Sequence, residues 1–168
     1  MKIHIIGGSG SGKTYLARML SQKYNIPHYD LDGLFWDNSS NHYGKKNTSE
    51  KRDALLKGIL HNKDWIIEGV YYSWLTESFE KADIIIILDV PKRVCKSRII
   101  RRFFKRKIGL EHVKKESIKS ILDLLKWADR FEKVNLPEIY TLLEDHNDKI
   151  TILRSAKQVR NYITVLDY

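Results

Sequence analysis

Short apolar runs alternate along this chain with segments in which apolar residues recur every three or four positions. The runs have the length of buried strands, and the periodic segments have the spacing of amphipathic helices. This alternation predicts an α/β fold in which helices cover both faces of a parallel sheet and the crossovers are right-handed. The predicted strands are 2–6, 26–30, 64–68, 84–88 and 148–153.

Turn and capping residues give the predicted helices their ends. Asn25 and Pro27 end the first helix near Tyr24, and Asn47 is the expected N-cap of the helix that runs to Leu60. That helix should bury Leu55, Leu56, Ile59 and Leu60. The other predicted helices are 91–107, 111–134, 137–144 and one that follows the capping box Ser155–Gln158.

The chemistry of the chain centres on a glycine-rich turn between the first strand and the first helix. Its spacing, Gly, four residues, then Gly-Lys-Thr, is that of a phosphate-binding P-loop. Glycines turn backbone N–H groups toward an anion, and the following helix adds its positive end. Lys13 is expected on the β- and γ-phosphates, and Thr14 on Mg²⁺. The pattern predicts ATP and Mg²⁺ as ligands of Gly7, Gly8, Ser9, Gly10, Ser11, Gly12, Lys13 and Thr14.

Length and composition limit the class of protein. The 168 residues suit a single domain over 1–168, and the hydrophobic content of 42% is that of a soluble globular protein. The apolar runs are too short to cross a bilayer, and a start that leads directly into a strand argues against a signal peptide. The single cysteine, Cys95, excludes an internal disulfide. We expect a cytoplasmic protein that has no contact with a membrane.

Positive charge is concentrated in one segment. The net charge is +9, and residues 91–107 hold nine basic side chains and no acidic one. The rest of the chain has 21 basic and 21 acidic residues, so this basic helix carries the entire excess. It predicts a polyanionic partner, either a nucleotide or a nucleic acid.

Four carboxylates follow predicted strands, at the edge where α/β proteins place their catalytic groups. We assign Asp30 to the metal and Asp32 to the acceptor's proton. Glu68 is either an alternative base, an acid on the metal side, or a partner of the basic helix. Asp89 is either a metal ligand or a turn residue.

These motifs together resemble the P-loop nucleoside and nucleotide kinases, which include adenylate and shikimate kinases. The order of segments is most similar to the bacterial topology-modulation and flagellar-regulator group. Asp89-Val90-Pro91 resembles the adenylate kinase segment that enters the lid. The resemblance implies strand order 2-3-1-4-5, Arg98 on the adenine, Arg102 on phosphates, and Arg154 and Ser155 beside the adenine. Glu68-Gly69 lacks the arginine that adenylate kinases carry nearby, which argues against AMP as the acceptor.

The sequence therefore predicts a three-layer P-loop kinase with a helical lid near 98–115. It would transfer the γ-phosphate of Mg-ATP to a nucleoside, a nucleotide or another small hydroxyl compound. The alternative is a nucleotide-dependent regulator that binds DNA or RNA through the basic helix, although no known nucleic-acid-binding motif appears. The acceptor and the oligomeric state stay open. Five loop aromatics either stack on a substrate ring or pack locally: Trp36, Tyr43, Tyr71, Tyr72 and Trp74.

Overall fold

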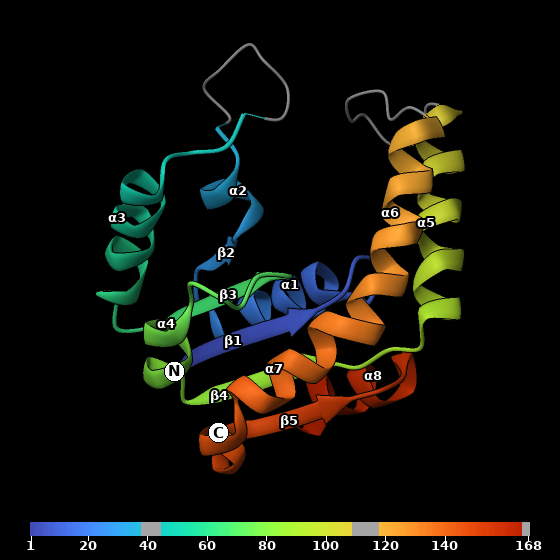
Figure 1. Ribbon diagram of the computed structural model, residues 1–168. Coiled ribbons are helices and arrows are strands. Elements are labelled where there is room, and N and C mark those ends of the chain that lie inside the picture. The colour runs from blue at the N-terminus through green and yellow to red at the C-terminus, as the bar shows by residue number, and fades with distance from the viewer. Residues whose placement is uncertain (38–44, 109–117, 166–168) are drawn as a thin grey trace.

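The computed structural model describes residues 1–37, 45–108 and 118–165. A five-stranded parallel sheet has the order β2-β3-β1-β4-β5, which confirms the predicted topology. The strand that enters the P-loop lies in the middle of the sheet (Figure 1). The strands are β1 Lys2–Gly7, β2 His28–Asp30, β3 Trp65–Gly69, β4 Ile84–Leu88 and β5 Ile150–Leu153.

Helices connect the strands and form the outer layers. Ile3 and Ile5 of β1 pack with the buried side of the first helix and with Val159 of the last one. Ile67 and Ile85 point to the opposite face of the sheet and pack against the other helices. The helices are α1 Lys13–Tyr24, α2 Asp32–Phe35, α3 Ser49–Leu60, α4 Thr76–Lys81, α5 Lys92–Lys107, α6 Ile118–Arg130, α7 Leu136–Leu142 and α8 Ala156–Val165.

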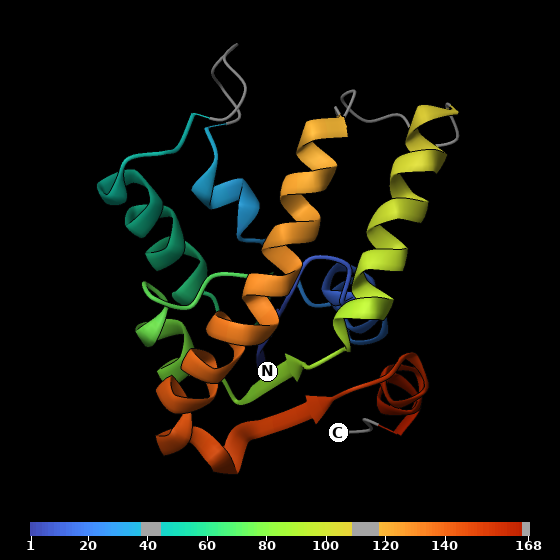
Figure 2. The ribbon, with the colours of Figure 1, turned by 45° about the vertical axis from the view of Figure 1, so that its right-hand side comes forward.

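Helices α5 and α6 stand side by side as an antiparallel pair that projects from the carboxyl edge of the sheet (Figures 1 and 2). At the base, Lys96 Nζ lies 2.7 Å from Asp129 of α6, and Lys92 Nζ lies 2.6 Å from Glu132 in the turn that follows α6. Helix α6 continues through a π-helical turn, Phe131–Asn135, into α7. The first part of the predicted lid, residues 98–107, lies in α5, and its residues 109–115 lie outside the described residues.

Several local predictions were wrong. The N-cap of α3 is Thr48, whose side chain accepts from the Lys51 N–H, whereas Asn47 donates to the carbonyls of Leu34 and Trp36. Leu55 is 43% exposed because it lies off the stripe that faces the sheet. Helix α4 has no counterpart among the predicted helices, since it is too short to show a period. The predicted helix segment 111–117 and Tyr43 lie outside the described residues.

Other boundaries agree closely with the sequence. Helix α1 ends at Tyr24, and Asn25 takes the left-handed conformation with φ of 54°. Helix α5 ends at Lys107, close to the expected break. Ser155 Oγ accepts from the Gln158 N–H at 3.2 Å, so the predicted capping box opens α8. Strand β4 is buried along its whole length, as its run of isoleucines predicts.

A buried histidine beneath the P-loop makes the fold sensitive to acid. His4 is fully buried, its Nδ1 lies 2.8 Å from Ser78 Oγ, and burial lowers its pKa from 6.5 to about 3. The unfolded chain therefore takes up this proton first, and stability is lost as the pH falls from about 6.5 toward 3. We expect the free energy of unfolding to fall by up to about 1.4 kcal/mol per pH unit from this group.

Urea titrations at pH 7, 6 and 5 measure this effect. His4→Gln is the matched control, because it removes the titrating ring and leaves the other histidines in place. An equal pH dependence in the two proteins would rule out His4 as the source.

Candidate functional site

The P-loop is shaped by two glycines and by an arginine from α5. Gly10 and Gly12 have φ of 79° and 107°, and a Cβ on Gly10 would lie 2.6 Å from the carbonyl oxygen of Cys95. Only glycine fits a left-handed position so close to backbone. Arg98 Nη1 donates to the carbonyls of Gly10 and Ser11, at 3.1 and 2.9 Å. Arg98 thus fixes the loop from the α5 side, a contact that no sequence pattern indicated.

Lys13 lies inside the loop rather than on an open surface. It is 9% exposed, and its Nζ donates to the Gly8 carbonyl at 3.1 Å. Burial lowers the pKa of Lys13, and the negative charges of Glu68, Asp32 and Asp30 oppose that shift. The ammonium is therefore held where the loop encloses an anion, beside three carboxylates.

Glu68 is the acid that the structure brings closest to the P-loop. It pairs with Asp30 across strands β2 and β3 and with Ile5 of β1. Its side chain is 2% exposed, and Thr14 Oγ1 donates to its Oε1 at 2.5 Å. Glu68 thus contacts the hydroxyl assigned to the metal, and no ion pair joins it to α5 among the described residues.

The pKa values of Glu68 and Asp30 shift in opposite directions. Burial raises the pKa of Glu68, but the nearby His28 ring, the charge of Lys13 and the Thr14 hydroxyl together outweigh it, and the pKa is lowered. His28 Nε2 lies 3.8 Å from Glu68 Oε1. Burial and the Glu68 charge raise the pKa of Asp30, against the hydrogen bond from the Asp32 N–H. The surroundings thus favour the ionised form of Glu68 and disfavour that of Asp30.

Asp32 begins α2 and is held by an aromatic neighbour. The Tyr71 hydroxyl donates to Asp32 Oδ1 at 2.8 Å, and the Tyr71 ring stacks on Phe35 at 4.6 Å between centroids. Burial and the Asp32 charge raise the pKa of Tyr71, so its hydroxyl stays a donor. Trp36 and Trp74 extend this cluster, with Arg52 over the Trp74 ring. Trp36, Tyr71 and Trp74 therefore belong to one aromatic cluster, whereas the Tyr72 hydroxyl donates to Glu138 and accepts from Asn135.

A cavity of about 590 Å³, here named the carboxylate cavity, brings these groups together. The P-loop forms one wall, the ends of β2 and β3 another, and α5 the third. Its acids are the predicted Asp30 and Asp32 together with Glu68. The lining residues are Ser9, Gly10, Gly12, Lys13, Thr14, Tyr15, Arg18, Asp30, Asp32, Glu68, Gly69, Val70, Arg102 and Arg106.

Arginines of α5 reach two different places, the carboxylate cavity and the carbonyl groups of the P-loop. Arg102 and Arg106 are one turn apart and both line the carboxylate cavity. Arg102 Nε is buried and has no hydrogen-bond partner among the described residues. Arg98, one turn before Arg102, reaches the loop carbonyls instead. Arg106 was not among the site residues predicted from the sequence, yet it lines the cavity.

A second cavity of about 340 Å³, the α8 cavity, lies on the other side of Gly12 and Tyr15. Arg98 and Arg101 line it from α5, and the first turns of α8 line it from below. Neither Arg154 nor Ser155 is among its lining residues. Arg154 Nε instead lies 3.2 Å from Asp89 Oδ2, so Asp89 holds a turn together. The contact of Arg154 and Ser155 with adenine stays a prediction.

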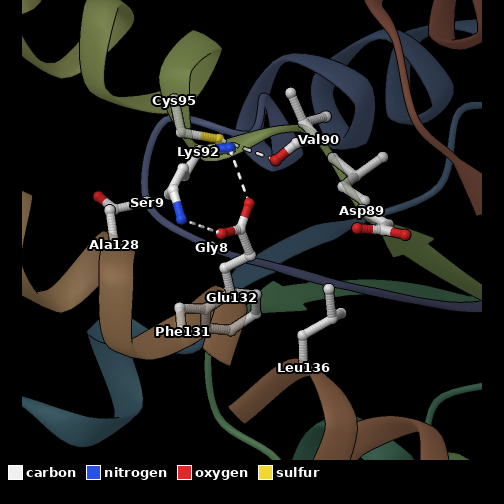
Figure 3. A pocket seen from close by; sticks show the side chains of 11 residues that line it. Gly8, Ser9, Asp89, Val90, Lys92, Cys95, Ala128, Phe131, Glu132 and Leu136 are labelled. Carbon is white, nitrogen blue, oxygen red and sulfur yellow. Dashed lines mark hydrogen bonds and ion pairs between the residues drawn. The ribbon is translucent and has the colours of Figure 1, made fainter. Parts of the chain in front are cut away.

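The π-helical turn after α6 closes over the start of the P-loop. Figure 3 shows the carboxylate of Glu132 directed at Lys92, with Phe131 and Leu136 below. A Cβ on Gly8 would lie 3.0 Å from the Phe131 ring. The hollow between these residues measures only about 20 Å³, which is room for about one water molecule. The residues around this hollow pack the α5–α6 pair against the P-loop.

The described residues contain neither a preformed metal cluster nor a membrane-spanning helix. No group of three or more His, Cys, Asp or Glu side chains is arranged there to hold a metal ion. None of the described helices has the length and apolar character needed to cross a membrane.

Comparison with known proteins decides the family. A model of the AAA domain matches residues 3–119, which span the P-loop, the carboxylates and α5. The chain belongs to the AAA domain family. This AAA domain is 28% identical over 148 residues to the uncharacterised protein YqaC of Bacillus subtilis, covering 86% of the chain and 80% of YqaC.

Kinases are also among the proteins that this AAA domain resembles. It is 26% identical over 127 residues to an adenylate kinase of Clostridium kluyveri, covering 61% of the chain and 58% of that enzyme. Shikimate kinase of Acinetobacter baumannii, solved with shikimate, has a TM-score of 0.62 at 16% identity, over 97% of the chain and 88% of the enzyme. Shikimate kinase of Bacteroides thetaiotaomicron has a TM-score of 0.55 at 17% identity, over 99% and 96%. The AAA domain therefore has the kinase-like P-loop fold, whereas membership of the topology-modulation group stays a prediction.

Three polar residues of the site were missed by sequence reasoning. Arg18 lies one helical turn beyond Thr14, so the i, i+4 spacing could have placed it on the same face of α1. Arg106 has the same spacing from Arg102. His28 carries no such signal, because its position beside Glu68 depends on the pairing of β2 with β3.

The buried position of Lys13 leads to a first test of the site. We expect Lys13→Ala to weaken binding of a fluorescent ATP analogue by about a hundredfold, because two charge-assisted hydrogen bonds contribute about 3 kcal/mol. Equilibrium titration measures the affinity. Lys105→Ala, on the exposed side of α5, is the control and should bind as the unaltered protein does. Equal affinities would exclude Lys13 from the nucleotide site.

Proposed function

We propose that this AAA domain is a small-molecule kinase that transfers the γ-phosphate of ATP to a hydroxyl group. The observation that carries the proposal is the carboxylate cavity, in which Lys13 and Thr14 face Asp30, Asp32 and Glu68. A P-loop alone indicates only nucleotide binding. A P-loop that shares a cavity with strand-end carboxylates supplies phosphate binding and proton acceptance at one place.

The two cavities support an arrangement for the substrates. ATP would lie with its nucleoside in the α8 cavity, beside Arg98, and with its phosphates along the P-loop toward Lys13. The γ-phosphate would then enter the carboxylate cavity, where the acceptor lies. Arg102 projects there from α5 and would stabilise the charge on the transferring oxygens.

Magnesium fits the donors present at this point. Thr14 Oγ1 and the carboxylate of Glu68 are hard oxygen ligands 2.5 Å apart, and Asp30 stands beside Glu68 in the neighbouring strand. These residues would hold the ion directly or through water. When bound, Mg²⁺ neutralises charge on the β- and γ-phosphates. We thus add Glu68 to the metal side, where the sequence assigned Thr14 and Asp30.

Asp32 would act on the acceptor. The Tyr71 hydroxyl occupies its Oδ1, which leaves Oδ2 to accept the proton of the acceptor's hydroxyl. The acceptor oxygen forms a bond to the γ-phosphorus, the bond from that phosphorus to the bridging β-oxygen breaks, and ADP leaves. Closure of the α5–α6 pair over the cavity would exclude water, which would otherwise accept the phosphoryl group.

An acceptor screen with ATP and Mg²⁺ tests this function. ADP release above the basal rate, with phosphorylated acceptor detected by mass spectrometry, would support it. A panel of nucleosides, nucleotides, sugars and hydroxy acids on which no compound raises the rate would count against it. A cytoplasmic location stays a prediction.

A further inference from the structure

The proposed transfer step uses only some of the basic side chains in the carboxylate cavity. Four basic side chains line it: Lys13, Arg18, Arg102 and Arg106. Lys13 is surrounded by the P-loop and Arg102 approaches from α5, so these two face the phosphates. Arg18 lines the same cavity from α1, and Asp32, which would meet the acceptor, lines it from α2.

Arg18 is not engaged elsewhere in the described part of the chain. It is exposed, and it makes no hydrogen bond or ion pair with any described residue. The two aspartates in the same cavity are already engaged: Asp32 Oδ1 accepts from Tyr71, and Asp30 Oδ1 accepts from the Asp32 N–H. The guanidinium of Arg18 is therefore a donor group directed to the cavity without an internal acceptor among these residues.

We propose that the acceptor carries an anionic group, a phosphomonoester or a carboxylate, which Arg18 binds while the reacting hydroxyl meets Asp32. This inference rests on the proposed kinase function and names its substrate class. A planar guanidinium donates two parallel hydrogen bonds to either anion, which fixes the orientation of the acceptor as well as its position. Arg18 would therefore select nucleotides and phosphorylated or acidic hydroxyl compounds over neutral nucleosides and sugars.

The acids of the cavity do not oppose this selection. Glu68 and Asp30 lie on the metal side, where a cation and Lys13 would offset their charge. Asp32 is the remaining acid near the acceptor, and it would receive a proton from the hydroxyl. An acceptor whose anionic group lies beside Arg18 would thus meet a cation at its anionic end. Its hydroxyl group would meet Asp32, which accepts the proton.

Matched pairs of acceptors test the proposal. The probes are the ribonucleoside 5′-monophosphates against their nucleosides, glycerol 3-phosphate against glycerol, and glycerate against glyceramide. We expect at least one anionic member to exceed its neutral partner at least tenfold in kcat/KM. The phosphate and carboxylate pairs show which anion is preferred.

Substitution of Arg18 assigns the effect to this residue. Arg18→Gln should raise KM for the anionic acceptor by about tenfold to a hundredfold, with little change in kcat or in KM for ATP. Arg18→Lys should recover part of the loss, since it keeps the charge without the planar pair of donors. Arg93→Gln, an exposed arginine of α5 that lines neither cavity, is the matched control and should leave both constants unchanged.

Calorimetry separates this proposal from the kinase function. Binding of the same pairs is measured in the presence of a non-hydrolysable ATP analogue and Mg²⁺. Anion-selective binding that Arg18→Gln removes would support the inference even where no phosphoryl transfer occurs. Equal binding and turnover of neutral and anionic partners, or anion selectivity that survives Arg18→Gln, would overturn it.

Discussion

Replacing Asp32 with Asn is expected to lower the rate of phosphoryl transfer by about 10²–10⁴-fold, the contribution of a positioned general base. Affinity for ATP should stay nearly unchanged, because Asp32 begins α2 and does not belong to the P-loop. The amide oxygen of Asn can still accept from the Tyr71 hydroxyl, so the aromatic cluster and the start of α2 are kept. Single-turnover kinetics and ATP-analogue titration measure the two quantities separately.

Two other carboxylates serve as comparisons for Asp32. Asp123→Asn, on the exposed side of α6, changes the same chemical group outside both cavities and should have no effect. Glu68→Gln should raise the Mg²⁺ concentration needed for half-maximal rate, since Glu68 contacts Thr14. A rate loss in Glu68→Gln that saturating Mg²⁺ does not restore, together with an active Asp32→Asn, would make Glu68 the base.

Replacing Arg102 with Gln is the second large effect that we expect. A preorganised donor aimed at developing charge contributes about 10²–10³-fold to the rate, and Arg102 lines the carboxylate cavity with a buried Nε. The loss should fall on kcat, because the charge on the transferring group increases in the transition state. Steady-state kinetics with the best acceptor measures it.

The control for Arg102 also separates a kinase lid from a nucleic-acid surface. Lys105→Gln and Lys107→Gln remove exposed charges of α5 that line neither cavity, and together they should leave turnover unchanged. If α5 instead binds DNA, its charges act collectively, and log affinity falls linearly with log salt. A steep salt dependence that this double change flattens, without acceptor-stimulated turnover, would favour the regulatory function over the kinase.

The sequence alone determined the features that depend on neighbouring residues. The P-loop is contiguous, so its glycines, Lys13 and Thr14 could be recognised from spacing. Strand β4 and the end of α1 were also predictable, because a run of isoleucines and a left-handed Asn25 are local preferences. The strand order came from resemblance to the kinases, and the sheet confirms it.

Tertiary structure decided which charged groups meet. Glu68 reaches Thr14 only because β3 lies between β1 and β2, and that pairing also sets it beside Asp30 and His28. The direction of α5 likewise decides that Arg98 meets the loop carbonyls while Arg102 and Arg106 enter the carboxylate cavity. A sequence shows the spacing of charges along one helix. The packing of that helix against the sheet determines which of those charges are exposed to solvent and which line the site.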